Sequence, residues 1–271
     1  MIPFEVIRGD GPIVLGMPHG GTFVPDAIFA RLNARGQGLD DTDWHIDHLY
    51  SDLLPDATII RSNVHRYVID ANRDPAGASL YPGQNTTALC PLTDFDGQEI
   101  WQAGQHPSED EIEARRVAYH APYHAALAEE LERIRARHGV AVLYDCHSIR
   151  SVIPYLFAGT LPINNVGTNG GETCATEIET AVHDICLKAE PDETVLNGRF
   201  KGGWTTRHYG QPKRGVHAIQ METAQRAYMD EYAPWTFRPD LAERLRPVLS
   251  DVLKTLEILA LSGRLSVEQG A

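Results

Sequence analysis

Three short apolar segments, each followed by polar residues, constrain the fold of this chain more than any other feature of its sequence. The segments are residues 12–17 (PIVLGM), 140–144 (VAVLY) and 216–221 (VHAIQM). Each has the length and the apolar content of a buried strand. The polar residues that follow these segments include His19, Asp145, His147 and Glu222. We therefore expect polar side chains at three strand ends.

Two long amphipathic helices accompany these strands. The first is expected over residues 108–134, where a capping box starts at Ser108 and apolar residues recur at helical spacing. Pro122 lies inside this pattern and predicts a kink. The second covers residues 241–259, and Pro247 could divide it into two helices.

Strands that alternate with long helices predict an α/β fold, with a largely parallel or mixed central sheet and helices on both faces. Ligands of such sheets collect beyond the carboxyl ends of the strands. Residues 73–107 and 162–173 are rich in turn-forming residues and are expected to be long loops. No linker or repeat forces a boundary, so we expect residues 1–271 to form a single catalytic domain.

The composition argues against membrane and disulfide-rich proteins. No apolar run approaches the roughly 18 residues that cross a bilayer. The N-terminal MIPFEVIRGD lacks a basic start and an apolar core, so a secretory signal is not expected and the cytoplasm is the expected location. The four cysteines form no C-x-x-C pair and are expected to be reduced thiols.

The net charge of -13 makes nucleic acid an improbable partner. It also disfavours an acidic small molecule, unless cations gather in one cleft. Such cations occur in the glycine-rich segment 197–210, which contains Lys201 and Arg207, and singly at Arg73 and Arg150. The alternative is that these cations belong to a solvated loop and to surface ion pairs.

A catalytic zinc ion usually takes three His or carboxylate ligands and leaves one position open. His19, Asp43 and His147 could supply this set, with Asp145 orienting a ligand from two residues before His147. The alternative is that these histidines end strands by chance and only cap turns.

Other candidates are weaker. His120 and His124 are spaced as in H-E-x-x-H enzymes, but no glutamate lies between them, so a packing or surface role is expected. Cys146 would point away from His147, and we expect a packed thiol rather than a nucleophile. The GTNGGE segment lacks the G-K-[ST] of a phosphate loop.

Several longer motifs are similar to those of the N-formylglutamate deformylase (N-formylglutamate amidohydrolase) family. They are PHGG (18–21), DTDWHID (41–47), VIDANRDP (68–75), DCHSIRSVIP (145–154), NGRFKGGWTTRHYGQP (197–212) and HAIQMET (217–223). The resemblance covers most of the chain. It implies a zinc-carboxypeptidase-like (phosphorylase/hydrolase-like) fold and an activity at the last step of one histidine-degradation route.

The resemblance implies that His19 and His147 bind the metal ion and that Glu222 is the catalytic glutamate. Carboxypeptidases place a third ligand three residues after the first histidine, where this chain has Thr22. We therefore expect Asp43 to replace it, with Asp47 in reserve. The family's substrate is an acidic small molecule, and its carboxylates would be bound by residues of the following set: Asn72, Arg73, Arg150, Lys201 and Arg207.

The implied reaction is hydrolysis of N-formylglutamate to formate and glutamate by a zinc-activated water, with Glu222 as the general base and acid. Two other functions remain open from the sequence. One is a zinc amidohydrolase for another N-acyl amino acid or a small peptide, and the other is a noncatalytic metal-containing protein that binds small anions. The sequence leaves the oligomeric state open.

Overall fold

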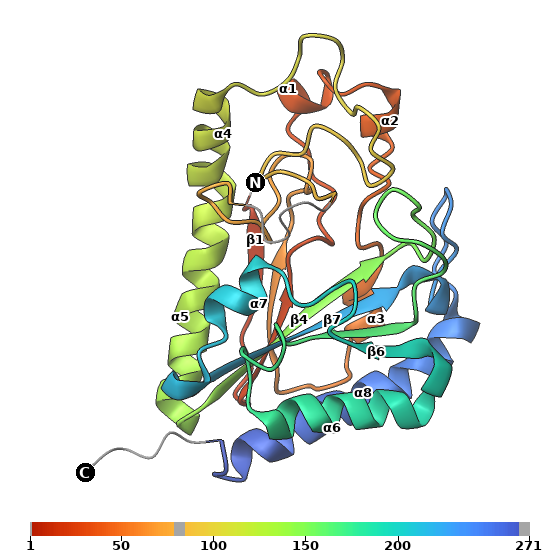
Figure 1. Ribbon diagram of the computed structural model, residues 1–271. Coiled ribbons are helices and arrows are strands. Elements are labelled where there is room, and N and C mark those ends of the chain that lie inside the picture. The colour runs from red at the N-terminus through yellow and green to blue at the C-terminus, as the bar shows by residue number, and fades with distance from the viewer. Residues whose placement is uncertain (1, 79–84, 266–271) are drawn as a thin grey trace.

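A seven-stranded mixed sheet forms the centre of the molecule, in the order β1-β3-β2-β4-β7-β5-β6 (Figure 1). The structure is a computed structural model that describes residues 2–78 and 85–265. Its strands are β1 (Phe4–Ile7), β2 (Ile13–Met17), β3 (Thr58–Ser62), β4 (Ala141–Ile149), β5 (Asn164–Gly167), β6 (Thr194–Leu196) and β7 (Val216–Ala224). Strands β3, β2, β4 and β7 are mutually parallel, while β1, β5 and β6 run in the opposite direction.

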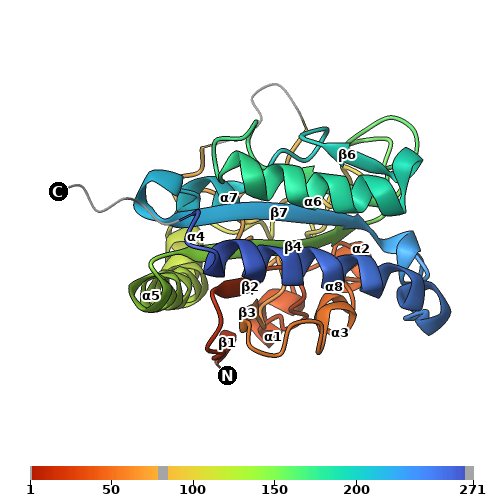
Figure 2. The same cartoon turned by 90° about the horizontal axis from the view of Figure 1, so that it is seen from below.

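Helices cover both faces of this sheet, which confirms the predicted α/β class. One face carries α5 (Ala121–His138) and α7 (Trp204–Tyr209), and the other carries α3 (Ile46–Tyr50), α6 (Thr176–Ala189) and α8 (Pro239–Leu261). Figure 2 shows α6 and α8 running side by side along the sheet. The short α1 (Asp26–Phe29) and α2 (Ala34–Gln37) lie among the long loops at one end of the sheet (Figure 1).

The two faces of β4 differ in their packing partners, because successive side chains of a strand alternate between faces. Leu143 packs with residues of α5, whereas Tyr144 and Cys146 belong to the core cluster beneath α8. Asp145 and His147 therefore lie on the same face of β4 as Leu143, the face that is covered by α5 and α7.

Among the described residues, no helix is both long and apolar enough to cross a membrane.

His19 follows β2 as expected, but Asp145, His147 and Glu222 lie inside their strands and not after them, which corrects the sequence expectation for these three residues. Strand β4 continues through Asp145 and His147 to Ile149, and β7 continues past Glu222 to Ala224. The two strands remain paired along their whole length. Pairing with a central neighbour satisfies the backbone, so the strands extend beyond the apolar run that marks them in the sequence.

The two long helices form as expected, with one difference each. The first consists of α4 (Glu109–Arg115), a π-helical turn (Arg116–His120) and α5, and the Ser108 hydroxyl accepts a hydrogen bond from the Glu111 amide. The π turn ends two residues before Pro122, whose nitrogen cannot donate a hydrogen bond to the preceding turn. The second helix, α8, is not divided at Pro247. Pro247 is exposed, so water can solvate the carbonyl group that the proline leaves without a donor.

One predicted loop is partly wrong. Residues 162–173 contain β5, which pairs antiparallel with β7 at buried positions. Asn165 is buried there, and its side-chain amide donates to the carbonyl oxygens of Pro162 and Glu222. Tertiary pairing thus overrides the turn preference of asparagine. In residues 73–78 and 85–107 the structure contains no helix and no named strand, as expected for that part of the loop.

The four cysteines are buried and none forms a disulfide bond. Burial raises the pKa of Cys146 well above its usual value. These thiols therefore remain protonated packing groups, as the sequence predicts.

Candidate active site

Strands β4 and β7 place His147 and Glu222 beside each other. The two residues are register partners on adjacent parallel strands, so their side chains leave the same face of the sheet. Asp145 and Gln220 form the preceding pair on that face, two residues closer to the centre of the strands. A histidine, a glutamate and two orienting groups thus stand together near the carboxyl ends of the strands.

His19 and Asp43 reach the same place from two loops. His19 lies in the turn after β2, and the Asp43 amide donates to the His19 carbonyl oxygen at 3.1 Å. The turn passes close to a neighbouring segment at Gly21, where an added Cβ atom would lie 2.4 Å from the carbonyl carbon of Asn63. A glycine is therefore needed for the turn that directs His19 inward.

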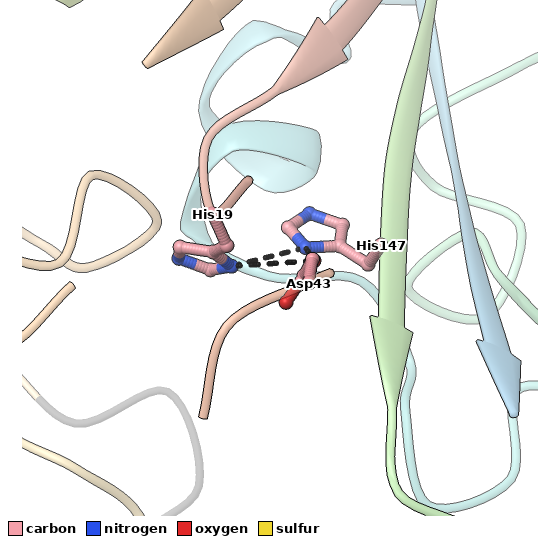
Figure 3. A group of neighbouring side chains, drawn as sticks. All are labelled: His19, Asp43 and His147. Carbon is pink, nitrogen blue, oxygen red and sulfur yellow. Dashed lines mark hydrogen bonds and ion pairs between the residues drawn. The ribbon is translucent and has the colours of Figure 1, made fainter. Parts of the chain in front are cut away.

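The side chains of His19, Asp43 and His147 converge on one point (Figure 3). The two imidazole Nδ1 atoms are 3.2 Å apart. Asp43 Oδ2 lies 3.5 Å from Nδ1 of His147 and 3.9 Å from Nδ1 of His19. All three residues are buried. The predicted ligand set is thus brought together from three distant parts of the chain.

The other imidazole nitrogens face carboxylates. Nε2 of His19 lies 2.7 Å from Asp70 Oδ1, and Nε2 of His147 lies 3.0 Å from Asp145 Oδ1. A carboxylate only accepts, so each one favours the tautomer that carries its proton on Nε2. The Nδ1 lone pairs are then directed at the point of convergence, in the carboxylate–histidine arrangement that is common at metal sites.

This geometry fits a metal ion. Two lone pairs 3.2 Å apart repel each other unless a cation lies between them. Ligand nitrogens bound to a tetrahedral zinc ion at 2.0–2.1 Å are about 3.3 Å apart. Two imidazoles and one carboxylate also match the donor set of catalytic zinc, which leaves a fourth position for a reactant.

The ionisation of the site favours a positive charge at its centre. Burial and the nearby charge of Arg66 lower the pKa of His19 to about 4, so this imidazole is neutral. Burial also opposes ionisation of His147, but the carboxylates of Asp145 and Asp43 raise the pKa of His147 well above its usual value. The pocket therefore attracts a cation, which can be a proton or a metal ion.

Arg66 is a buried cation beside the ligand set. Its Nη2 donates to Asp43 Oδ1 at 2.8 Å, and its guanidinium carbon lies 4.8 Å from the centre of the Phe95 ring. Although burial opposes ionisation of Asp43, the adjacent Arg66 charge holds the pKa of that carboxyl group below its usual value. Asp43 is thus kept as a carboxylate.

Carboxylates outnumber guanidinium groups around this point. The residues are Asp43, Asp70, Asp145, Glu222, Arg66 and Arg73. When the four carboxyl groups are ionised and both imidazoles are neutral, two negative charges remain after pairing with the two arginines. A divalent cation between the neutral imidazoles would balance them.

Glu222, His19 and His147 line the same cavity. Its volume is about 620 Å³ when the space at its open mouth is included. Burial, reinforced by the negative charge of Asp43, raises the pKa of Glu222 to about 7. A carboxyl group that titrates near neutral pH can both take up and release a proton during one reaction cycle.

The residues expected to bind substrate fall into two groups. Asn72 and Arg73 line the cavity. In the part of the chain that the structure describes, the cavity lining does not include Arg150, Lys201 or Arg207. Arg150 is 3.2 Å from Asp96 Oδ2, and Arg207 Nε donates to the Gly202 carbonyl oxygen. The arginines that line the cavity are Arg66, Arg73 and Arg199.

The alternative candidates have packing and pairing partners elsewhere. Nε2 of His120 is 3.0 Å from the Arg73 carbonyl oxygen, and Nε2 of His124 is 2.7 Å from that of Ala71. These contacts agree with the packing role expected for the pair. Asp47 forms a 2.8 Å ion pair with Arg61, so the geometry favours Asp43 as the carboxylate of the ligand set.

Sequence reasoning did not single out Arg66, Asp70 or Gln220. All three are buried around the ligand set, and Gln220 Nε2 donates to Glu222 Oε2 at 3.0 Å. A usable signal was present for Arg66 and Asp70, because charged residues interrupt the otherwise apolar segment 64–71. No comparable signal marks Gln220, whose role depends on the face of β7 it occupies.

Comparison with known proteins shows extended similarity. A family model described as N-formylglutamate amidohydrolase matches residues 11–229. An N-formylglutamate deformylase of Pseudomonas aeruginosa is 45% identical over 251 residues, which is 92% of this chain and 94% of that protein. One of Pseudomonas putida is 42% identical over 251 residues, covering 92% and 93% of the two chains.

Two solved structures share the fold. The crystal structure of N-formylglutamate amidohydrolase from Ralstonia eutropha superposes with a TM-score of 0.79 at 23% identity, covering 97% of this chain and 100% of that one. A gene product of Agrobacterium tumefaciens gives a TM-score of 0.68 at 18% identity, with coverages of 95% and 97%.

Proposed function

Because the chain belongs to the N-formylglutamate amidohydrolase family, we propose that it hydrolyses N-formyl-L-glutamate to formate and L-glutamate with one divalent metal ion, zinc. The observation that carries the metal-dependent part of this proposal is the convergence of two imidazole Nδ1 atoms and one carboxylate oxygen in the cavity that contains Glu222. We further propose that residues 1–271 act as a single catalytic domain on this acidic small molecule.

His19, Asp43 and His147 would hold the ion. Their second contacts, to Asp70, Arg66 and Asp145, keep these three side chains in position. A divalent ion held there supplies Lewis acidity, which lowers the pKa of water towards about 7.

Glu222 would move the proton. As a carboxylate it accepts a proton from the attacking water while the water oxygen bonds to the formyl carbon. It then returns that proton to the amide nitrogen as the carbon–nitrogen bond breaks, which releases formate and the amine of glutamate. The pKa of about 7 for Glu222 suits both halves of this transfer.

Arg66 would face the negative charge that develops on the formyl oxygen. It lines the cavity together with His19, His147 and Glu222, and Asp43 fixes its position. A fixed cation at this place stabilises the transition state more than the neutral substrate amide.

Arg73 and Arg199 would bind the two carboxylates of the glutamyl part, since both line the cavity and guanidinium groups pair well with carboxylates. For Arg150, Lys201 and Arg207, direct substrate binding stays a prediction from the sequence. Their positions outside the lining support at most a long-range electrostatic contribution.

The decisive experiment measures metal content and formate release on the same preparation. We expect about one zinc per chain, loss of formate release after chelation and recovery when zinc is returned. Full activity in a metal-free preparation would refute the metal-dependent mechanism.

A panel of N-formyl, N-acetyl and peptide substrates, compared by kcat/KM, tests the substrate assignment. We expect N-formylglutamate to give the highest value, and a higher value for an acetyl or peptide substrate would contradict it.

A further inference from the structure

The first turn of α7 contacts three buried polar side chains that surround His147 and Glu222. This turn begins after Gly203, the N-cap residue, and includes Thr205 and Thr206. Both threonines are fully buried. Helix α7 packs on the face of β4 and β7 that carries the candidate active site.

One set of contacts leads to His147. Thr206 Oγ1 donates to Asp145 Oδ2 at 2.9 Å, and the other carboxylate oxygen of Asp145 lies 3.0 Å from His147 Nε2. The Thr205 amide donates to Asn72 Oδ1 at 2.9 Å, and Asn72 Nδ2 lies 3.2 Å from the same His147 nitrogen. Asp145 and Asn72, the two polar neighbours of His147 Nε2, are thus both hydrogen-bonded to the first turn of α7.

A second set of contacts leads to Glu222. The Gly203 amide donates to Gln220 Oε1 at 2.6 Å. The opposite end of that side chain, Nε2, donates to Glu222 Oε2 at 3.0 Å. Gln220 is buried and therefore has little freedom to exchange these partners for water.

Because Gly203 has no side chain, the contacts that lead to His147 and those that lead to Glu222 can both form at the start of α7. A Cβ atom at this position would lie 2.3 Å from Asn72 Nδ2 and 2.6 Å from Asn72 Oδ1. The backbone of Gly203 can therefore reach Gln220 while Asn72 packs directly against it. This close approach explains why a glycine immediately precedes α7.

We propose that the start of α7, residues 203–206, is a positioning element that holds the metal ligand His147 and the base Glu222 in one fixed relation. Thr206 acts through Asp145, and Gly203 acts through Gln220. The inference rests on the proposed roles of His147 and Glu222 and on the contact of Asp145 with His147, and it adds Gly203, Gln220 and Thr206 as positioning residues.

Thr206→Val tests the contact that leads to His147. The substitution keeps the size of the side chain but removes the donor to Asp145. We expect zinc affinity, measured by competition with a chromophoric chelator, to fall about tenfold, the lower end of the range for groups that orient metal ligands. Thr206→Ser restores the hydroxyl and should recover most of the affinity. Tyr123→Phe is the control, because it removes a buried hydroxyl that makes no hydrogen bond within the described chain.

Gln220→Met tests the contact that leads to Glu222. It removes both the acceptor for Gly203 and the donor to Glu222 at similar side-chain volume. We expect kcat to fall about tenfold or more because the base loses its orientation, with KM and zinc affinity changed by less than about twofold.

The inference is overturned if Thr206→Val binds zinc as tightly as Tyr123→Phe, or if Gln220→Met keeps the kcat of the wild type. Thermal unfolding of each variant detects a general loss of structure. Such a loss would lower zinc affinity and kcat together in both variants, and it would contradict the inference that one contact leads to His147 and the other to Glu222. The wild-type protein separates this inference from the proposed function. If the wild type binds no metal and releases no formate, the proposed function fails, whereas a normal wild type with unaffected variants refutes only the positioning element.

Discussion

Glu222→Gln should abolish most of the activity and, at the same time, stabilise the metal-free protein. The glutamine has the shape of the glutamate and can present its amide oxygen to the Gln220 donor that now contacts Glu222 Oε2. It cannot accept the proton of the attacking water. General acid–base catalysis contributes typically 10²- to 10⁴-fold, so kcat should fall within that range.

The stability change follows from the pKa of Glu222, which burial raises from its usual value of 4.5 to about 7. The folded protein therefore binds this proton more tightly than the unfolded chain does. The resulting contribution to stability is fully present below about pH 4.5 and is lost as the pH rises through about 7. Its size is roughly 3 kcal/mol, at 1.36 kcal/mol for each unit between the two values. A neutral glutamine avoids this loss.

Urea unfolding of chelated wild type and variant, at pH 5 and pH 8, measures the effect. We expect the variant to be more stable by roughly 1 kcal/mol at pH 5 and by roughly 3 kcal/mol at pH 8. Zinc content of the reconstituted variant should match that of the wild type. A stability difference that does not widen with pH would refute the assigned pKa, and a kcat near that of the wild type would refute the role of Glu222 as base.

Three further substitutions test other parts of the structure. Arg199→Gln should raise KM for N-formylglutamate by about tenfold and raise KM for an uncharged N-formyl amide much less, and equal effects on the two substrates would argue against a carboxylate contact. Leu143→Ala should lower the free energy of unfolding by about 2–5 kcal/mol, because Leu143 is fully buried against α5; a change below about 1 kcal/mol in urea unfolding would contradict that packing. Pro247→Ala should raise the unfolding free energy by about 2 kcal/mol, since proline in a helix interior costs about 3 kcal/mol relative to alanine and its rigidity in the unfolded chain offsets up to about 1 kcal/mol. A lower melting temperature for this variant would show that Pro247 makes a favourable contact.

Local patterns in the sequence determined the elements of the fold and the chemical groups of the site. Apolar runs identified the strands that carry the site, and helical spacing identified the two long helices, because these patterns reflect which faces are buried. Residues at or beyond the ends of the apolar runs then supplied His19, His147 and Glu222 as candidates.

Tertiary pairing decided the strand boundaries and the sheet neighbours. β5 forms from an asparagine-rich segment whose local preference is for turns, because β7 and buried hydrogen bonds stabilise it there. β4 and β7 extend through their polar residues for the same reason. Such stabilisation comes from residues far away in the chain, and local propensity does not contain it.

The candidate site follows the same division. The sequence alone determined that two histidines and several acids were available near strand ends, and the resemblance to a family suggested which ones. Only the tertiary structure decided that Asp43 and not Asp47 lies with the histidines, and that Arg66, Asp70 and Gln220 hold the site in place. The physical reason is that charge pairing and hydrogen bonding depend on distances of a few ångströms between segments that are up to about two hundred residues apart, and those distances exist only in the folded chain.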